Sequence, residues 1–259
     1  MKSHSGKGKV VRRVLIGAGI VVAGLLAVVA AIVGLYLYVT RPVSSGEKLA
    51  SGAITAVVTG HSGPIAAVAY VFDLADGSLG LVDTGIDPAA ANIKTVVSDL
   101  GKTAPSVRAV FITHRHSDHA GALLAFPEAV VYGLSPDVDA LRQRRERAGA
   151  TGETKSVKSG ERLDVHGTSV EVFGLPGHTP GSAAYVVHGV LFLGDAAHSL
   201  RDGTFGTNEM FSEDGAANTR SVRSLIEQLR PRADIRQVAF GHSGPLTGLG
   251  ALLTWASAK

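Results

Sequence analysis

Six consecutive residues after a predicted strand constrain this chain more than any other feature of its sequence. Val107–Thr113 (VRAVFIT) is predicted as a buried strand, and the sequence HRHSDH follows it directly. Three histidines and an aspartate are more than a hydrophobic core can satisfy, whereas neutral imidazoles and carboxylates are common metal ligands. A chance match to H-x-H-x-D-H in a chain of this composition is on the order of one in a thousand. The motif therefore predicts a metal site at the end of this strand.

The spacing of the four side chains predicts two metal ions, since a single cation cannot easily hold so many adjacent side chains. His114 and His116 alternate along the chain and would face one metal. Asp118 and His119 would face the second. Further ligands are needed to complete both coordination shells.

Three more candidate ligands stand where other predicted strands end. His178 lies in PGHTPGS after the strand SVEVF, Asp195 follows VLFLG, and His242 lies in GHSG after QVAF. Each is a histidine or an aspartate beside glycine. Strand ends at one edge of a layered sheet converge on a shared cleft, so four such sites in one chain predict a common centre.

The order of these residues resembles the metallo-β-lactamase fold superfamily across essentially all of residues 53–259. The resemblance implies an α/β fold, a four-layer αβ/βα sandwich, with a site for two Zn²⁺ ions along one edge. The implied ligands are His114, His116 and His178 for one metal, Asp118, His119 and His242 for the other, and Asp195 as the bridge. It also implies that Asp83, in VDTG, is a structural residue that supports the metal-binding loop through hydrogen bonds.

Departures from the commonest family pattern indicate which branches of the superfamily this chain resembles most. The commonest zinc β-lactamases carry a Cys where this chain has Asp195, and this chain contains no Cys. A bridging Asp resembles the glyoxalase II, lactonase and phosphodiesterase branches. Diiron relatives replace the second motif histidine by Glu, so His116 favours redox-inert zinc and hydrolysis. The mononuclear-iron persulfide dioxygenase branch keeps the motif and remains an alternative.

Two further histidines have open roles. His198 lies three residues after Asp195, where lactonases that cleave acyl-homoserine lactones resemble this pattern but carry a Tyr beside the substrate carbonyl. A histidine there could polarise the carbonyl or protonate a leaving group as a catalytic residue, and a surface or supporting role fits equally. His61 lies in the pentapeptide GHSGP that is repeated at His242. We prefer His242 as the ligand because it follows a strand late in the chain, as the family pattern requires.

The N-terminal region predicts a membrane anchor. Residues 14–39 contain no charged side chain, and a helix of this length would be about 39 Å long, more than the ~30 Å hydrocarbon core of a bilayer. The alternative, a cleaved signal peptide, usually has an apolar region of only ~7–15 residues. Basic residues precede the helix, which predicts a single-pass protein of the cell membrane with residues 1–13 in the cytoplasm. Residues 40–52 are expected to be a linker and residues 53–259 an extracytoplasmic hydrolase domain.

Charge and composition exclude several classes of protein. The first 41 residues hold six of the 25 basic side chains and no acidic one, which leaves 19 basic and 22 acidic side chains and a net charge of −3 in residues 42–259. A mildly acidic domain lacks the basic footprint of a nucleic-acid-binding protein. The absence of Cys excludes disulfide scaffolds, iron–sulfur clusters and thiol catalysis. Small residues at intervals of four in the apolar helix would allow it to form a homo-oligomer.

The remaining pattern predicts strands mixed with helices. Asp87–Leu100 and Pro136–Ala148 are among the predicted helices, and the second ends with four arginines that we interpret as a solvated face. The expected activity is hydrolysis of a small ester, lactone or related carboxyl derivative by a metal-bridging hydroxide, which Asp118 would orient while moving its proton. A domain outside the cytoplasm argues against glutathione thioesters and tRNA precursors. Alternatives are a phosphodiesterase, the dioxygenase, and a non-catalytic membrane-anchored binding module.

Overall fold

The computed structural model describes residues 5–258 and separates the chain into two compact units, 1–39 and 40–259. The first unit is a single helix, α1 (Ser5–Val39). Its segment Ala18–Val39 has a mean hydropathy of 2.8 and is the one helix of the described residues that is long and apolar enough to cross a membrane. Signal sequences near an N-terminus share these properties, so the predicted membrane topology stays a prediction.

Two mixed β-sheets form the centre of the second unit. The first sheet has the order β1 (Lys48–Leu49), β2 (Ile54–Ser62), β3 (Ile65–Asp73), β4 (Leu79–Val82), β5 (Val107–Phe111), β6 (Val130–Leu134) and β7 (Thr154–Val157). The second has the order β15 (Leu246–Thr247), β14 (Gln237–Ala239), β11 (Val190–Phe192), β10 (Ala183–Val187), β9 (Thr168–Gly174) and β8 (Arg162–Val165). A separate hairpin pairs β12 (Ala197–Ser199) with β13 (Phe205–Thr207).

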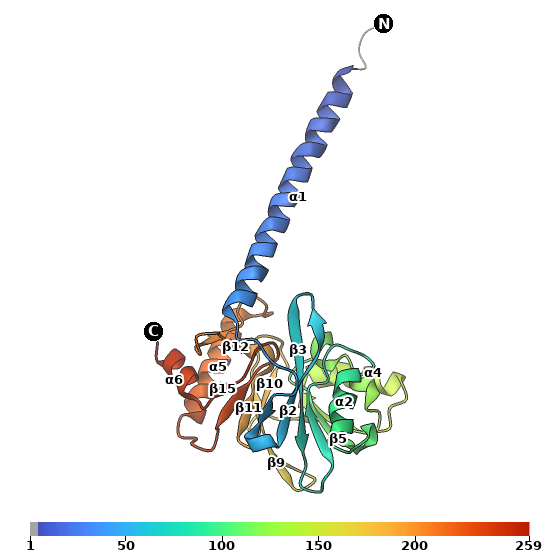
Figure 1. The fold of residues 1–259 in the computed structure, drawn as a ribbon, viewed down its shortest axis with the longest axis vertical. Helices are drawn as coiled ribbons and strands as arrows, with labels where there is room; N and C mark the ends of the chain where they lie inside the picture. The colour runs from blue at the N-terminus through green and yellow to red at the C-terminus, as the bar shows by residue number, and fades with distance from the viewer. Residues whose placement is uncertain (1–4, 259) are drawn as a thin grey trace. The chain divides into compact units, whose positions relative to one another are not determined.

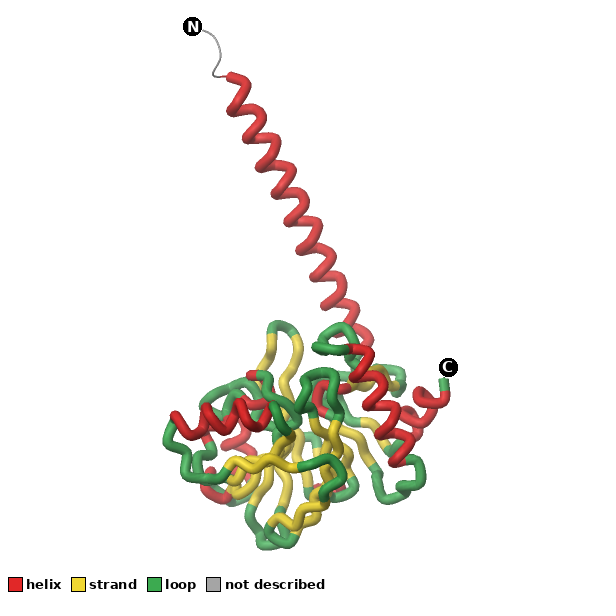
Figure 2. The backbone as a smooth tube through the Cα atoms, turned by 180° about the vertical axis from the view of Figure 1, so that it is seen from behind, coloured by secondary structure: helices red, strands yellow, loops and turns green. Residues whose placement is uncertain are grey.

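Helices cover the outer faces of the sheets, as Figure 1 shows for α2 and α4 on one side and α5 and α6 on the other. The helices of the second unit are α2 (Ala91–Asp99), α3 (Ser117–Ala120), α4 (Asp137–Arg147), α5 (Gly215–Leu229) and α6 (Gly250–Ser257). The view from behind shows the same order, with helices outside the strands (Figure 2). This arrangement confirms the predicted four-layer αβ/βα sandwich.

Side chains that alternate between the two faces of each strand, and apolar side chains at helical spacing in α5, account for these layers. One face of each sheet contributes to a core between the sheets, where Phe72, Phe111, Tyr185 and Phe192 are at most 1% exposed. The opposite faces pack against the helices in two further cores. In α5 the buried residues Val222, Leu225, Ile226 and Leu229 follow the spacing of one helical face. Each such side chain contributes about 1.5–3 kcal/mol by leaving water.

The helix predicted from Asp87 begins later, at Ala91. The carboxylate of Asp87 accepts hydrogen bonds from the backbone N–H groups of Ala89 and Ala91, at 3.0 and 2.8 Å. Ala90 lies between them with a φ of +54°, which a helix cannot accommodate. Asp87 therefore forms the turn that precedes the helix.

Two other predictions were wrong. The segment 40–52 is not a free linker, since β1 pairs with β2 and Leu49 is fully buried in the central core. The arginines of α4 are not all solvated: Arg145 is 1% exposed, and Arg144 donates to the carbonyls of Ala120 and Gly121. The guanidinium of Arg145 donates to the carbonyl oxygens of Leu123, Phe126, Pro127, Ala129 and Gly152. Composition alone cannot show that carbonyls lacking strand or helix partners will gather around one arginine.

Candidate metal centre

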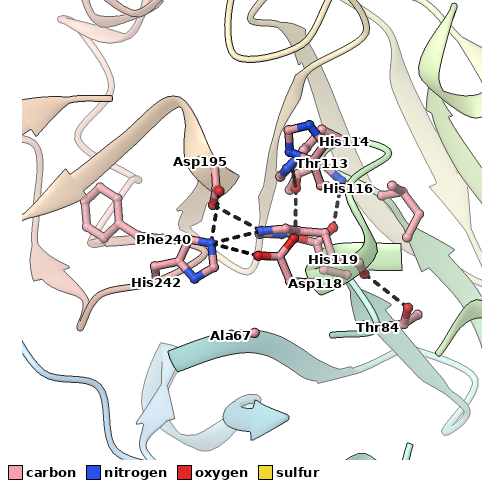
Figure 3. A network of polar contacts seen from close by, with 12 residues as sticks. Ala67, Thr84, Thr113, His114, His116, Asp118, His119, Asp195, Phe240 and His242 are labelled. Atoms are coloured by element: carbon pink, nitrogen blue, oxygen red, sulfur yellow. Dashed lines mark hydrogen bonds and ion pairs between the residues drawn. The ribbon is translucent and has the colours of Figure 1, made fainter. Parts of the chain in front are cut away.

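The carboxyl ends of four strands supply the candidate ligands. β5 leads into the HRHSDH segment and α3, whereas β9, β11 and β14 run parallel to one another in the second sheet and lead to His178, Asp195 and His242. The two sheets meet at this edge, where the N–H of Ala183 donates to the carbonyl of Thr113 at 2.8 Å. In Figure 3, Asp195 and His242 approach from one side and the HRHSDH residues from the other.

All seven predicted ligands belong to three overlapping groups that could each hold a metal ion. Within each group the candidate ligand atoms lie within 4.8 Å of one another. The groups are His114, His116 and His178; His114, His119 and Asp195; and Asp118, His119 and His242. Asp195 lies between the others: its Oδ2 is 3.0 Å from His242 Nε2 and its Oδ1 is 3.2 Å from His119 Nε2.

Hydrogen bonds to the outer ring nitrogens of three histidines fix which nitrogen faces the centre. His119 Nδ1 donates to the carboxylate of Asp83 at 2.8 Å, and His242 Nδ1 donates to the carbonyl of Ala66 at 2.6 Å. His114 Nδ1 lies 3.1 Å from Thr113 Oγ1, which itself donates to Asp83. In all three rings Nε2 is left to face the centre, as in metal sites where an outer acceptor sets the tautomer.

Asp83 organises the loop that carries the motif. Its two carboxylate oxygens accept hydrogen bonds from the N–H and the hydroxyl of Thr113, both at 2.8 Å, as well as from His119. Asp83 has a φ of +59°, a conformation that costs a non-glycine residue about 1–3 kcal/mol. The backbone adopts it because the carboxylate is then fully hydrogen-bonded while only 2% of the residue is exposed.

Charge is distributed unevenly over the centre. Burial lowers the pKa of His114 well below its usual value and also lowers the pKa of His178. Burial acts the same way on His119, but Asp195 and Asp83 outweigh it and raise the pKa of His119 well above the usual range. Burial opposes ionisation of Asp195, yet His119 and His242 hold the pKa of Asp195 well below its ordinary value. The centre is thus a carboxylate among imidazoles, two of which are poor bases.

The donor set fits divalent cations. His178 Nε2 lies 3.1 Å from both His114 Nε2 and His116 Nδ1, and these nitrogens cannot all satisfy one another by hydrogen bonds. Ligand nitrogens around a tetrahedral cation with ~2.0–2.1 Å bonds are about 3.3 Å apart, close to this spacing. A Cβ atom on Gly241 would collide with Asp195 and His119, so this glycine lets the backbone border the centre closely.

The other predicted residues lie as follows. Asp118 is partly exposed, and its Oδ2 is 3.5 Å from His242 Nε2. His198 lies on β12, and a Cβ atom on the facing Gly206 would be 3.2 Å from its Nε2. His61 is exposed near the end of β2 and is in none of the three groups found among residues 5–258.

Two tyrosines that hold the strand ends have no recognisable signature in the sequence. Tyr70 in the first sheet donates to the carbonyl of Phe240, which follows β14, at 2.7 Å. Tyr185 in the second sheet donates to the carbonyl of Ile112, which follows β5, at 2.8 Å. Each hydroxyl therefore crosses to the other sheet and binds the chain two residues before a candidate ligand. Burial raises the pKa of both tyrosines above the usual value.

Comparison with known proteins agrees with this geometry. The profile of the family described as "Metallo-beta-lactamase superfamily" matches residues 62–242. The chain belongs to this superfamily. The matched segment runs from the end of β2 to His242 and contains all seven candidate ligands.

Curated relatives within this superfamily are named hydroxyacylglutathione hydrolases. The protein from Thermosynechococcus vestitus is 35% identical over 132 residues, 49% of this chain and 48% of the relative. The protein from Aeromonas hydrophila is 34% identical over 118 residues, 44% of this chain and 42% of the relative. The chain thus spans about half the length of these relatives. Their similarity supports the glyoxalase II side of the resemblance.

Solved structures share the fold. The BLEG-1 B3 metallo-beta-lactamase superposes with a TM-score of 0.59 at 24% identity, covering 79% of this chain and 100% of that one. A metallo-beta-lactamase superfamily protein from Sulfolobus tokodaii has a TM-score of 0.52 at 20% identity, covering 75% and 81%. At these identities the similarity establishes the architecture and nothing about substrates.

Proposed function

We propose that this protein is a zinc-dependent hydrolase of a small ester, lactone or related carboxyl derivative. The observation that carries the proposal is the set of three overlapping His/Asp groups at the edge where the sheets meet. His114, His116 and His178 would hold one metal, Asp118, His119 and His242 the other, and Asp195 would bridge them. Imidazole and carboxylate ligands suit zinc, and no residue of the chain supplies thiolate.

Two bound divalent cations would supply an ionised water near neutral pH and polarise the substrate carbonyl. Asp118 is the most exposed carboxylate of the site, with 18% of its side chain accessible against 8% for Asp195. It can therefore orient a water molecule and take up its proton at Oδ2. Burial lowers the pKa of His198, so its ring is neutral at pH 7 and can donate one N–H to a substrate oxygen as negative charge develops there.

Several observations support a carboxyl derivative as substrate. The curated relatives are named for hydrolysis of hydroxyacylglutathione, which is itself an acyl compound. The second unit has a net charge of −3 over residues 42–259, which disfavours polyanionic substrates such as nucleic acids. Aspartate at position 195 agrees with the glyoxalase II and lactonase branches of the resemblance, and with the phosphodiesterase branch that is the alternative.

We further propose that α1 anchors the protein in the cell membrane with residues 1–13 in the cytoplasm and the second unit outside. The apolar segment Ala18–Val39 and the basic residues before it support this orientation. A substrate found outside the cytoplasm follows from it. A reporter fused after Lys259 should be active only in its extracytoplasmic form, and activity of a cytoplasm-specific reporter would overturn the orientation.

The full chain, loaded with zinc in detergent, tests the activity. A lactone, an aryl ester, a thioester, a chromogenic cephalosporin and a bis-aryl phosphate should be assayed together, and carboxyl derivatives should be cleaved faster than the phosphate. Asp118→Asn and His116→Ala should lower kcat/KM at least ~10²-fold, while Asp99→Asn, an exposed change on α2, should leave it unchanged.

The contrary outcomes select between the alternatives. Strong cleavage of the phosphate with negligible cleavage of lactone or esters would overturn the substrate class and leave the metal site standing. About one iron per chain together with oxygen consumption would identify a dioxygenase. A folded chain that binds no metal would indicate a non-catalytic module.

A further inference from the structure

Asp137 is a buried carboxylate that joins the two loops of the three-histidine group, His114, His116 and His178. It is the first residue of α4 and is 2% exposed. It lies outside the three metal-ligand groups, and the proposed hydrolysis does not use it. Asp137 is separated from the motif in the sequence, so its contacts with the motif loop are visible only in the folded structure.

Each oxygen of Asp137 accepts one hydrogen bond from each loop. Oδ1 accepts from Arg115 Nη1 at 2.7 Å and from the N–H of Gly181 at 3.1 Å. Oδ2 accepts from the N–H of Arg115 at 2.9 Å and from Thr179 Oγ1 at 2.7 Å. Arg115 stands between His114 and His116, and Thr179 follows His178. The four bonds therefore fix the backbone beside all three histidines.

The loop that follows His178 packs directly against this carboxylate. A Cβ atom on Gly181 would collide with Asp137, so glycine is required for the loop to come this close. Arg115 extends past Asp137 to the exposed Glu213, at 2.5 Å. The second candidate metal position is held differently, since His119 is bound by Asp83 and His242 by the carbonyl of Ala66.

We propose that Asp137 is a positioning residue for one metal only, the one held by His114, His116 and His178. Removing its charge would release the two loops from each other and weaken that metal, because the partners that orient ligands typically account for ~10–100-fold in affinity. The metal on Asp118, His119 and His242 would keep its own supports. This inference rests on the proposed metal site and is measured by metal binding, separately from hydrolysis.

The test is competition of the full chain with a chromophoric chelator for Zn²⁺. Asp137→Asn, which keeps the shape of the side chain, should bind one zinc at least tenfold more weakly and the other within about threefold of wild type. His116→Ala and His242→Ala assign the two binding steps, and the weakened step should be the one that His116→Ala removes. With Co²⁺ in place of zinc, the absorption spectrum of Asp137→Asn should change only for that metal.

Two further variants keep the test decisive. Glu213→Gln removes the outer ion pair of Arg115 and should leave both affinities unchanged. Thr179→Val removes one of the four bonds and should weaken the same step to a smaller degree, which decides the question if Asp137→Asn does not fold. Equal weakening of both metals, or no selective weakening, would overturn the proposal. Wild-type chain that takes up no zinc would overturn the proposed function as well.

Discussion

The two tyrosines that cross between the sheets make stability depend on alkaline pH. Tyr70 and Tyr185 are 3% and 0% exposed, and both hydroxyls donate to carbonyl oxygens. Burial raises the pKa of each phenol, Tyr185 in particular well above its ordinary value. The folded chain then keeps its phenolic protons at a pH where the unfolded chain loses them. Their contribution is fully present below the unfolded pKa and is lost as pH rises above it.

The size of this loss follows from the unfolded tyrosine. With an unfolded pKa of about 10, ionisation at pH 11 stabilises the unfolded state by about 1.4 kcal/mol for each tyrosine, and by almost nothing at pH 8. Both residues together should remove about 3 kcal/mol of the free energy of unfolding between pH 8 and pH 11. A Phe in either place keeps the edge-on contacts with Phe192 and Phe111 but cannot ionise. It loses about 1–2 kcal/mol at pH 8 through the missing hydrogen bond.

Denaturant unfolding of the metal-free full chain in detergent, at pH 8 and pH 11, measures this. Wild type, Tyr70→Phe, Tyr185→Phe and the double variant are compared at each pH, so that lysine and arginine titration cancels between them. Each Phe variant should lose about 1.4 kcal/mol less than wild type between the two pH values, and the double variant about 3 kcal/mol less. Equal losses in all four proteins would show that these phenols ionise normally in the fold and would refute the reasoning.

Three further predictions concern the metals, the buried arginine and His198. Chelation should lower the melting temperature by roughly 10 °C, because a metal at 1,000 times its Kd stabilises the fold by about 4 kcal/mol; an unchanged melting curve would contradict a metal held by the native state. Arg145→Met should destabilise the chain by about 3–5 kcal/mol in urea titrations, since it removes a buried donor from each of five carbonyls, and the exposed Arg147→Met should change stability by less than about 0.5 kcal/mol. His198→Ala should lower kcat about 10²-fold and leave KM within threefold, and unchanged kcat would leave this residue a supporting role.

Much of the candidate site could be predicted because its ligands directly follow predicted strands. HRHSDH follows β5, and His178, Asp195 and His242 each follow another strand beside glycine. Each ligand and the apolar strand before it are therefore neighbours in the sequence, where the pattern can be recognised. The residues that orient these side chains are not local. Thr113, Tyr70 and Asp137 act through partners 22 to 170 residues away, and nothing in their neighbouring sequence marks them.

The fold shows the same division. The predicted strand Val107–Thr113 begins at the same residue as β5, and the predicted strand QVAF begins with β14 at Gln237. The hairpin that carries His198 was not predicted, because β12 and β13 are only three residues long and rely on tertiary packing. The burial of Arg145 was missed for a related reason: a run of charged residues indicates a solvated face only if no cluster of loop carbonyls lies within reach of one of them.

The order of the strands along the chain has a consequence for folding. Every strand of the first sheet lies between residues 48 and 157, and every strand of the second lies between residues 162 and 247. Each half can therefore form its sheet from contacts within its own sequence before the two halves dock. His114, His116, Asp118 and His119 belong to the first half and His178, Asp195 and His242 to the second. In the proposed zinc enzyme, metal capture would follow the docking of the two halves, and the rate of zinc uptake would then measure how fast two preformed half-molecules dock.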